Sequence, residues 1–578
     1  MKGRRRPMDT DWWRTAVIYQ IYPRSFADSG GDGIGDLAGI TGRLDHLVDL
    51  GVDAVWISPF YRSPMRDFGY DVSDHRAVDP LFGDLDDFRR LLGEAHRRGL
   101  RVLVDLVPNH TSSDHPWFQE SAEGRDSARR DWYVWRDPAS GGGPPNNWLS
   151  VFGGGPAWTF DERSGQYYLH SFLPSMPDLN WRNPAVEQAM FDVVRFWLDL
   201  GVDGFRVDCA HFVMKDPLLR DNPPAAQGAQ AMHRPYGAYD EQVHVHDKGH
   251  ADVHAVYRRL RALLDSYTGG SSRIAIGEVH VFDWEEWAGY YGSELDELHI
   301  PFNFGLLRAK WDAAEVTELI RAVEQALPPG AWPNWVVGNH DEPRVASRLG
   351  AAQARVAMLL TLTLRGTPTL YYGDELGLPD AHVPPHLAQD PWARTAAGLG
   401  LGRDPQRSPM LWHNAPNAGF TADTATPWLP LAADPATHSV AAQWDRPGSM
   451  LLFTRSALHL RRSLPALHRG DQRLLDALPD GVVGYLRYAG RTAALVLLNL
   501  TGSEIRVSRK VLDGLRGFET LLGHVLHTVL STVDRPAGRV EWPLLLRGNE
   551  GLVLVPPAAA DGSATGGSGA VEAAEDGG

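Results

Sequence analysis

Eight short apolar runs, most of them separated by helical patterns, constrain the fold of this chain more than any other feature. They are residues 17–23, 54–60, 101–107, 204–210, 273–279, 297–304, 334–341 and 367–376. Before the second run, Ile40, Leu44 and Leu47 recur at helical spacing. Alternation of strand and helix is typical of an α/β parallel sheet, and eight such units predict a closed (β/α)8 TIM barrel. An open doubly wound sheet is the alternative, which the count of eight makes less favourable.

Two long interruptions and one change of pattern predict further structural units. The link after the third run is rich in Gly, Pro and Trp and is too long for a loop, so it predicts a small inserted domain. A second insertion, at about 213–250, is predicted to form a long loop over the barrel mouth. After the last helical pattern the chain reads as β strands split by turn residues, then as a small polar tail. The predicted limits are 1–107 and 179–469 for the barrel, 108–178 for the inserted domain, 470–557 for a β-sandwich and 558–578 for a disordered tail.

Charge and cysteine content narrow the class of protein. The formal net charge of −16 repels phosphate backbones, which disfavours a nucleic-acid partner. Cys209 is the one cysteine, which excludes an internal disulfide and suits a reducing, cytoplasmic location. The basic start of the chain is not followed by the apolar segment of a secretory signal, and no apolar run approaches the roughly 20 residues of a membrane helix. We therefore expect no membrane association.

Acidic side chains collect at the ends of the predicted strands, where the active site of such a barrel lies. Asp105 follows the third strand, Asp208 the fourth, Glu278 the fifth and Asp341 the seventh. Arg206 stands two positions before Asp208, so the two share one face of an extended strand. A fixed cation beside a carboxylate keeps it ionised and aims it. The pair is predicted to be catalytic, with a structural salt bridge as the alternative.

A long series of ordered motifs resembles glycoside hydrolase family 13, the α-amylase family, in its α-glucosidase branch. The likeness extends over nearly the whole chain. Its motifs are VIYQIYPRSFADSGGDGIGDL, DFGYDVSDH, DLVPNHTS, MPDLNW, GFRVD, GEV, NHDEPR, GTPTLYYGDELGL and GRDPQRSPMLW.

The resemblance implies roles for individual residues. Asp208 matches the catalytic nucleophile, Glu278 the general acid/base and Asp341 the residue that stabilises the transition state. Other matches hold or enclose the sugar: His110, Arg206 and His340 contact it, Asp67 binds a hydroxyl, Tyr70 stacks on the ring, Arg403 binds the terminal glucose in exo-acting members, and Phe152 and Phe172 wall the pocket. As lone aromatics, the two phenylalanines are equally compatible with a core position.

This resemblance implies a retaining, exo-acting α-glucosidase that acts on short, maltose-like α-glucosides and needs no cofactor. Such chemistry places a nucleophile and an acid/base roughly 5–5.5 Å apart. It calls for a raised pKa at Glu278 and a low one at Asp208. Position 209 tunes linkage preference in the family, where valine accompanies α-1,6 specialists, so Cys209 mildly favours α-1,4 bonds. Met176 stands where close α-glucosidases commonly carry Gln.

The stretch DSGGDGIGD resembles a calcium-type loop. Its candidate ligands are Asp28, Asp32, the carbonyl of Ile34 and Asp36. Relatives usually place Asn where Gly30 stands, and glycine supplies no side-chain oxygen. A structural Ca²⁺ and a metal-free, turn-forming loop both remain open.

Three alternatives share these motifs. One is an enzyme that mainly transfers glucosyl units, which would keep every catalytic residue. Another is a member specialised for sucrose or α-1,6 bonds. The third is a non-catalytic relative that carries a membrane helix, which the presence of Asp208, Glu278 and Asp341 disfavours.

Overall fold

In the computed structural model of the protein, residues 10–557 are described, apart from 154, 227–234, 396–397, 514, 516, 519–521 and 523–524. The predicted disordered tail, 558–578, therefore lies outside the described residues, as does part of the insertion at 213–250. Among the described residues, no helix combines the length and the apolar content that crossing a membrane requires.

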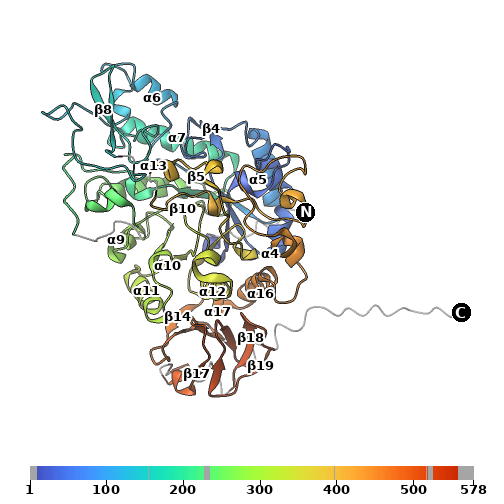
Figure 1. Cartoon of the computed structure of the whole chain (residues 1–578). Helices are drawn as coiled ribbons and strands as arrows, with labels where there is room; N and C mark the ends of the chain where they lie inside the picture. Colours follow the sequence, from blue (N-terminus) through green and yellow to red (C-terminus); the bar gives the residue numbers. More distant parts are fainter. Residues whose placement is uncertain are drawn as a thin grey trace, which may run out of the picture.

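A sheet of eight parallel strands forms a nearly closed barrel at the centre of the molecule (Figure 1). The strand order is β11-β10-β9-β5-β2-β1-β13-β12. The bounds are β1 (Ile18–Ile21), β2 (Ala54–Ile57), β5 (Arg101–Leu106), β9 (Gly204–Val207), β10 (Ile274–Gly277), β11 (Ile300–Pro301), β12 (Asn334–Trp335) and β13 (Thr367–Tyr371). The prediction of a (β/α)8 barrel is confirmed.

The strands are shorter than the apolar runs that predicted them. β12 keeps only the first two residues of its run. Further along the same run, the Asn339 side chain accepts the N–H groups of Asp341 and Glu342 at 2.8 and 3.0 Å, which forms a turn.

Side chains of the strands alternate between the barrel interior and the surrounding helices. On β9, Phe205 and Val207 are fully buried in the large apolar core that the helices share. Ile274, Ile276 and Trp56 belong to a separate cluster formed by alternate residues of successive strands, which is the barrel interior. Arg206 lies between Phe205 and Val207 and so points into this interior, with its guanidinium 4.9 Å from the Trp56 ring centre.

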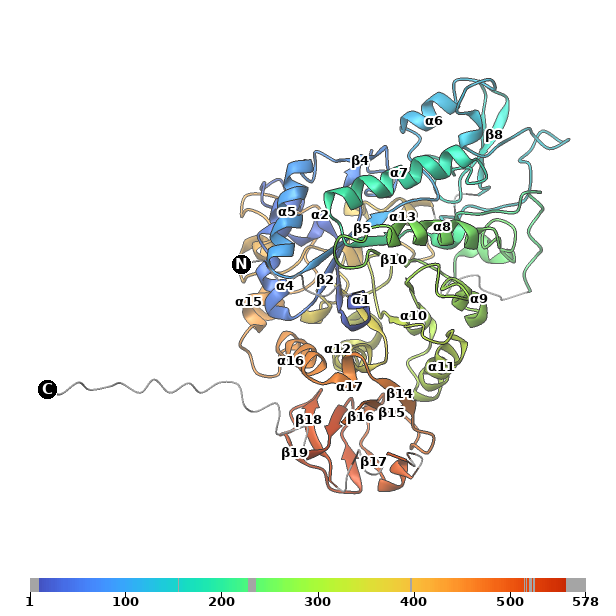
Figure 2. The same cartoon turned by 180° about the vertical axis from the view of Figure 1, so that it is seen from behind.

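Amphipathic helices cover the outside of the barrel (Figure 2). The Asp84 carboxylate begins α5 by accepting the N–H groups of the first turn, and Asp312 begins α11 in the same way. The main covering helices are α4 (Leu44–Leu50), α5 (Leu85–Arg97), α7 (Pro184–Leu200), α8 (Val253–Asp265), α11 (Ala313–Ala326), α12 (Val345–Thr363) and α16 (Met450–Ser463).

The chain between β5 and α7 forms a small excursion at one end of the molecule, where Figures 1 and 2 both place β8 and α6. Its antiparallel sheet has the order β6-β8-β7. The bounds are α6 (Pro116–Ser121), β6 (Trp135–Arg136), β7 (Trp158–Asp161) and β8 (Gln166–Leu169). An isolated bridge joins His110 to Asp178, so the two ends of the excursion meet beside the barrel mouth.

The C-terminal part is all-β and lies at the opposite end of the molecule (Figure 1). Its antiparallel sheet has the order β14-β15-β16-β21-β18-β19, and a two-stranded ribbon, β17-β20, accompanies it. The bounds are β14 (Asp471–Leu474), β15 (Val482–Ala489), β16 (Thr492–Asn499), β17 (Ile505–Val507), β18 (His527–Ser531), β19 (Gly538–Arg539), β20 (Leu544–Leu546) and β21 (Gly551–Val555). Tyr485 of β15 meets Thr363 of α12 through their hydroxyls at 2.6 Å, which ties this part to the barrel.

Candidate active site

A pocket with about 660 Å³ of empty volume opens at the carboxyl ends of the barrel strands. Its walls come from strand ends, from the excursion after β5 and from the chain beyond β13. The lining residues are Asp67, Tyr70, His110, Val151, Phe152, Phe172, Met176, Asp208, Cys209, Phe212, Tyr236, Glu278, His280, Asp341, Glu342, Trp392 and Arg403. Eleven of the residues singled out in the sequence, Cys209 and Met176 among them, line this pocket, and Arg206 and His340 lie directly behind its wall.

Arg206 joins three carboxylates from three neighbouring strands. Its Nη1 lies 2.5 Å from Asp208 and 2.8 Å from Asp105, and its Nη2 lies 2.9 Å from Glu278. Asp105 also accepts the Trp56 indole N–H at 2.7 Å. Because these side chains are almost fully buried, Arg206 supplies the positive charge that lets acidic groups gather here.

Asp208 and Glu278 face each other across the pocket floor. One oxygen of each, together with the Cys209 sulfur, lie within 4.8 Å of one another. The Cys209 backbone has φ 44°, a left-handed conformation that directs its N–H to Glu278 Oε2 at 2.8 Å. His280 Nε2 lies 3.1 Å from the other oxygen, Oε1. The Glu278 carboxyl is thus held from both sides.

The pKa directions of Asp208 and Glu278 differ from those expected from the sequence. Burial raises the pKa of Asp208 well above its usual range, although Arg206 opposes the rise. Burial also acts on Glu278, but Arg206, His280 and the Cys209 N–H together hold its pKa well below its usual range. The expected directions, raised at Glu278 and low at Asp208, are therefore reversed in this geometry. One reason is that Arg206, His280 and the Cys209 N–H all donate to Glu278. The other is that Asp208 and Glu278 are adjacent and titrate as a coupled pair.

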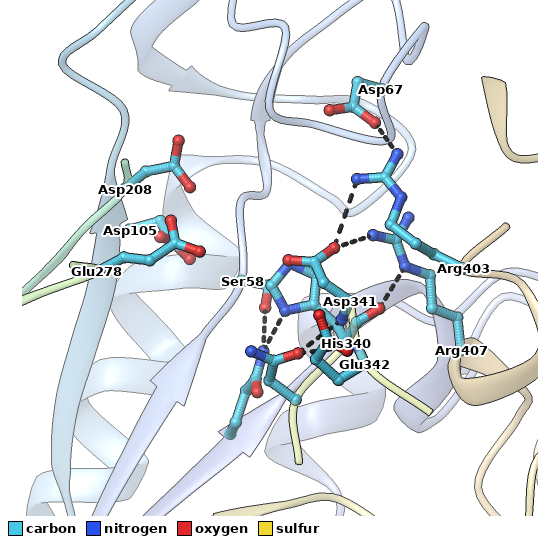
Figure 3. A network of polar contacts seen from close by, with 12 residues as sticks. Ser58, Asp67, Asp105, Asp208, Glu278, His340, Asp341, Glu342, Arg403 and Arg407 are labelled. Carbon is cyan, nitrogen blue, oxygen red and sulfur yellow. Dashed lines mark hydrogen bonds and ion pairs between the residues drawn. The ribbon is translucent and has the colours of Figure 1, made fainter. Parts of the chain in front are cut away.

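A second polar network forms the opposite side of the pocket (Figure 3). Asp341 pairs with Arg407 at 2.7 Å, with Arg403 at 3.4 Å and with His340 Nε2 at 3.3 Å. Burial opposes ionisation of Asp341, yet these three partners hold its pKa well below its usual range. Asp341 is therefore a fixed anion that faces the Asp208–Glu278 pair across the pocket.

His340 is clamped between aromatic rings and polar groups. Its ring is stacked with Tyr70 at a centroid distance of 5.3 Å and with Tyr22 at 5.8 Å. Its Nδ1 lies 2.7 Å from the Gln20 amide nitrogen, which leaves Nε2 to carry the hydrogen toward Asp341. Burial lowers the pKa of His340 to about 3, so the imidazole is a neutral donor at physiological pH.

The far end of the pocket is closed by a buried ion-pair chain. Arg403 pairs with Asp67 and also with Asp390, whose Oδ1 lies 2.7 Å from Nη2. The loop that carries Asp67 is held by Asp71, which accepts the Asp67 N–H at 3.0 Å. Gly69 in this loop has φ 109°, and an added Cβ would approach the Pro59 carbonyl to 2.8 Å. Burial raises the pKa of Asp67 to about 6, although Arg403 opposes this.

His110 is oriented by a chain of buried groups behind the pocket. Its Nδ1 lies 3.2 Å from the Asn109 amide nitrogen, and Asn109 in turn accepts from Lys215 Nζ at 2.6 Å. Lys215 also pairs with Asp178 at 2.6 Å. Burial lowers the pKa of His110 to about 4, so this imidazole too is neutral. Its Nε2–H is thereby directed away from the chain of partners.

Aromatic side chains form the outer walls. Phe152 and Phe172 lie edge to face at 5.4 Å, and Phe152 packs on Trp392 at 4.7 Å. Phe172 also contacts Phe212, at 5.3 Å, from the chain after β9. Both phenylalanines line the pocket and also belong to the large apolar core that the helices share.

The acidic loop at 28–36 lies outside this pocket, and its carboxylates are engaged within the loop. Asp28 accepts two glycine N–H groups of the loop at 2.7 Å each, and Asp36 caps α3 (Leu37–Thr41) through the Gly39 N–H at 2.6 Å. Asp32 accepts the Ile34 N–H at 2.9 Å. Within the described part of the chain, the group of His, Cys, Asp or Glu side chains with ligand atoms close enough for a metal is the one at Asp208. These hydrogen bonds fix the turns of the loop through its own carboxylates.

Several pocket residues were not identified from the sequence. Arg407 belongs to the recognised motif GRDPQRSPMLW, but no role was inferred for it. His280 stands two residues after Glu278, and a strand-end histidine is a detectable signal. Asp390 and Tyr236 come from irregular chain, and Trp392 lies in the five-residue helix α13 (Pro391–Thr395), which is too short for a periodic pattern to mark it.

Comparison with known proteins extends these observations. Residues 20–470 match the family model described as alpha amylase, catalytic domain. The chain is 45% identical over 504 residues to a probable alpha-glucosidase of Rhizobium meliloti (strain 1021), across 85% of this chain and 90% of that one. It is 37% identical over 569 residues to the oligo-1,6-glucosidase of Heyndrickxia coagulans, across 91% and 98%. The crystal structure of an alpha-glucosyl transfer enzyme matches with a TM-score of 0.85 at 42% identity, covering 94% of this chain and 99% of that one.

Proposed function

Because this chain belongs to the α-amylase family, glycoside hydrolase family 13, and is a glycoside hydrolase of its α-glucosidase branch, we propose that it cleaves short α-glucosides from their non-reducing end with retention of configuration. The observation that carries the proposal is the spacing of Asp208 and Glu278, with an oxygen of each within 4.8 Å. Retaining glycosidases place the two carboxyls roughly 5–5.5 Å apart, whereas inverting ones need about 6.5–9.5 Å to admit a water molecule.

The coupled pair shares one proton, and in the proposed mechanism this proton is on Glu278 when the substrate is bound. Asp208, then ionised, attacks the anomeric carbon while Glu278 gives the proton to the departing glycosidic oxygen. A covalent β-glucosyl ester forms at Asp208, and Glu278 is left ionised. Water then attacks the anomeric carbon of this ester while Glu278 takes a proton from the water; the bond from the sugar to Asp208 breaks, which restores both carboxyls. The donors around Glu278 and the fixed cation Arg206 support the ionised state that the second step requires.

The side of the pocket opposite these carboxyls supports a role in binding the sugar. Asp341 is a fixed anion, and neutral His340 and His110 are directional donors. Hydroxyls of a bound glucose would find acceptors and donors that need not reorganise as charge develops at the anomeric centre. The Asp67–Arg403 pair closes the end of the pocket, which favours removal of a single terminal unit over cleavage within a chain.

The first-formed sugar anomer tests the retaining mechanism. Proton NMR during cleavage of p-nitrophenyl α-glucoside, whose only sugar product is the glucose released from the enzyme, should show α-glucose before mutarotation. Asp208→Asn should lower kcat by roughly a thousandfold or more, because the nucleophile is lost. First-formed β-glucose would reject the retaining mechanism. A Glu278→Gln variant should lose far more kcat/KM on maltose than on p-nitrophenyl α-glucoside, whose leaving group needs no proton. Equal losses would remove the acid role.

A second candidate is predominant transfer of glucosyl units, which one observation favours. A further cavity adjoins the catalytic pocket at His280 and offers space for an acceptor molecule, and an alpha-glucosyl transfer enzyme is among the similar structures. Incubation at high maltose concentration separates the two: trisaccharides as main products indicate transfer, and glucose as the main product indicates hydrolysis. Disaccharides with α-1,4 and α-1,6 bonds in the same assay test the linkage preference that Cys209 suggests.

A further inference from the structure

The two oxygens of Glu278 lie in different surroundings, and this difference has a chemical consequence. Oε2 receives the Cys209 N–H at 2.8 Å and Arg206 Nη2 at 2.9 Å. A backbone amide and a guanidinium are donors without an acceptor lone pair, so a proton on Oε2 would face two N–H groups. The proton that an acid must carry therefore fits on Oε1, beside His280 Nε2 at 3.1 Å.

An imidazole suits an oxygen that alternates between two protonation states. When Glu278 is ionised, Nε2–H donates to Oε1. When Oε1 carries the proton, its remaining lone pair still accepts from Nε2–H, and its O–H can point at the leaving group. His280 therefore contacts this oxygen in both states of a carboxyl that serves as acid and then as base.

The place of the His280 ring is fixed by packing. It lies flat on Phe304 with a centroid distance of 4.2 Å and an interplanar angle of 5°, and its side chain is 12% exposed. It lines both the catalytic pocket and the adjoining cavity, whose other walls include Lys248, Asp283 and Arg308. The ring therefore stands between the catalytic pocket and the adjoining cavity.

Resting on the proposed function, we propose that His280 is a positioning residue that holds Oε1 of Glu278 toward the leaving-group side and stabilises both of its protonation states. His280 keeps its hydrogen on Nε2 throughout, so its own proton count does not change. The charged and titratable groups that face Glu278 from the neighbouring elements are Asp105, Arg206, Asp208, Cys209, His211, His280, His340 and Asp341.

The experiment compares His280→Phe, which keeps the stacked ring and removes the nitrogens, with the wild type. We expect kcat/KM on maltose to fall by roughly tenfold to a hundredfold, a part of what general acid catalysis supplies, and kcat/KM on p-nitrophenyl α-glucoside to change less than about threefold. Since His280 stabilises the Glu278 anion, its loss raises the pKa of that carboxyl and moves the alkaline limb of the maltose pH profile upward. His280→Gln, which keeps a group that donates and accepts, should restore part of the maltose activity.

His254→Gln is the matched control, because His254 pairs with Glu297 at 2.8 Å outside the lining of either cavity. It should leave the leaving-group dependence and the pH profile as in the wild type. Equal losses on both substrates in His280→Phe, or an unmoved alkaline limb, would overturn the inference. If Glu278→Gln loses more kcat/KM on maltose than on p-nitrophenyl α-glucoside and His280→Phe does not, only this inference fails. If Glu278→Gln loses kcat/KM equally on the two substrates, the acid role of Glu278 in the proposed function is wrong, whatever His280→Phe shows.

Discussion

At the scale of single residues, the site combines groups whose charge is fixed by their neighbours with groups, Asp67 and Asp105, whose pKa burial raises to about 6. Asp341 is held as an anion, and His110 and His340 are held neutral. Asp67 is different, because burial raises its pKa to about 6 against the opposing effect of Arg403. Its charge should therefore change within the pH range in which such an enzyme is assayed.

Affinity for glucose, measured as a competitive inhibitor, should fall as the pH drops through about 6. A carboxyl with a raised pKa is ionised above that value and protonated below it, and the protonated form loses both its charge opposite Arg403 and its strength as an acceptor. The inhibition constant should then rise by up to roughly tenfold per pH unit below the pKa. Asp67→Asn should bind glucose weakly at every pH and lack this step; the same step in both proteins would assign it to another group.

At the scale of elements, close packing of β9 against β10 sets the separation of Asp208 and Glu278. Gly204 begins β9, and a Cβ there would come within 2.3 Å of the Ile274 carbonyl oxygen on β10. The two strands end side by side, which brings the two carboxyls to one place.

Gly204→Ala should therefore destabilise the protein by about 1–3 kcal/mol, as overpacking of a buried site does. It should also lower kcat, because the strand shift that makes room also moves Asp208. Gly124→Ala is the control, since a Cβ at Gly124 meets nothing within 4 Å. Thermal unfolding and kcat measured together give the result, and a Gly204 variant with wild-type values in both would refute the role assigned to this contact.

Elements with a regular period could be predicted from the sequence, and irregular ones could not. The runs around Arg206 and Glu278 alternate with helical patterns, so both strands and the carboxyls at their ends were expected. Family motifs then supplied roles that spacing did not give. Trp392 and Asp390 lie in chain without periodicity, and their place in the pocket depends on tertiary contacts such as the Arg403–Asp390 pair. The direction in which the pKa of Glu278 shifts could not be predicted from the sequence either, because it depends on the backbone N–H of Cys209.

At the scale of the whole molecule, the C-terminal all-β part supports the barrel from the end opposite the inserted excursion (Figure 1). Arg487 of β15 is fully buried and donates to the carbonyls of Thr363 and Gly470, the latter at 2.8 Å. It thus joins the end of α12 to the start of the C-terminal part without touching the pocket.

Arg487→Met should lower the free energy of unfolding by about 2–4 kcal/mol, because buried carbonyls lose their donors. At a temperature where the variant is folded, kcat/KM should equal that of the wild type. Thermal denaturation and maltose kinetics at 25 °C test both parts. Unchanged thermal stability would show that Arg487 contributes little to this interface, and a large loss of kcat/KM in the folded variant would show that the two ends of the molecule are coupled.

The roof of the pocket is made where two excursions from the barrel meet: Thr395 donates to the Phe152 carbonyl at 2.6 Å, and Trp392 packs on the Phe152 ring. Neither segment belongs to a strand that carries an acidic catalytic candidate. Substitutions where these two segments meet can therefore change which substrates enter the pocket without altering the catalytic carboxyls. Enzymes descended from one ancestor can differ in substrate preference in this way while they keep the same reaction.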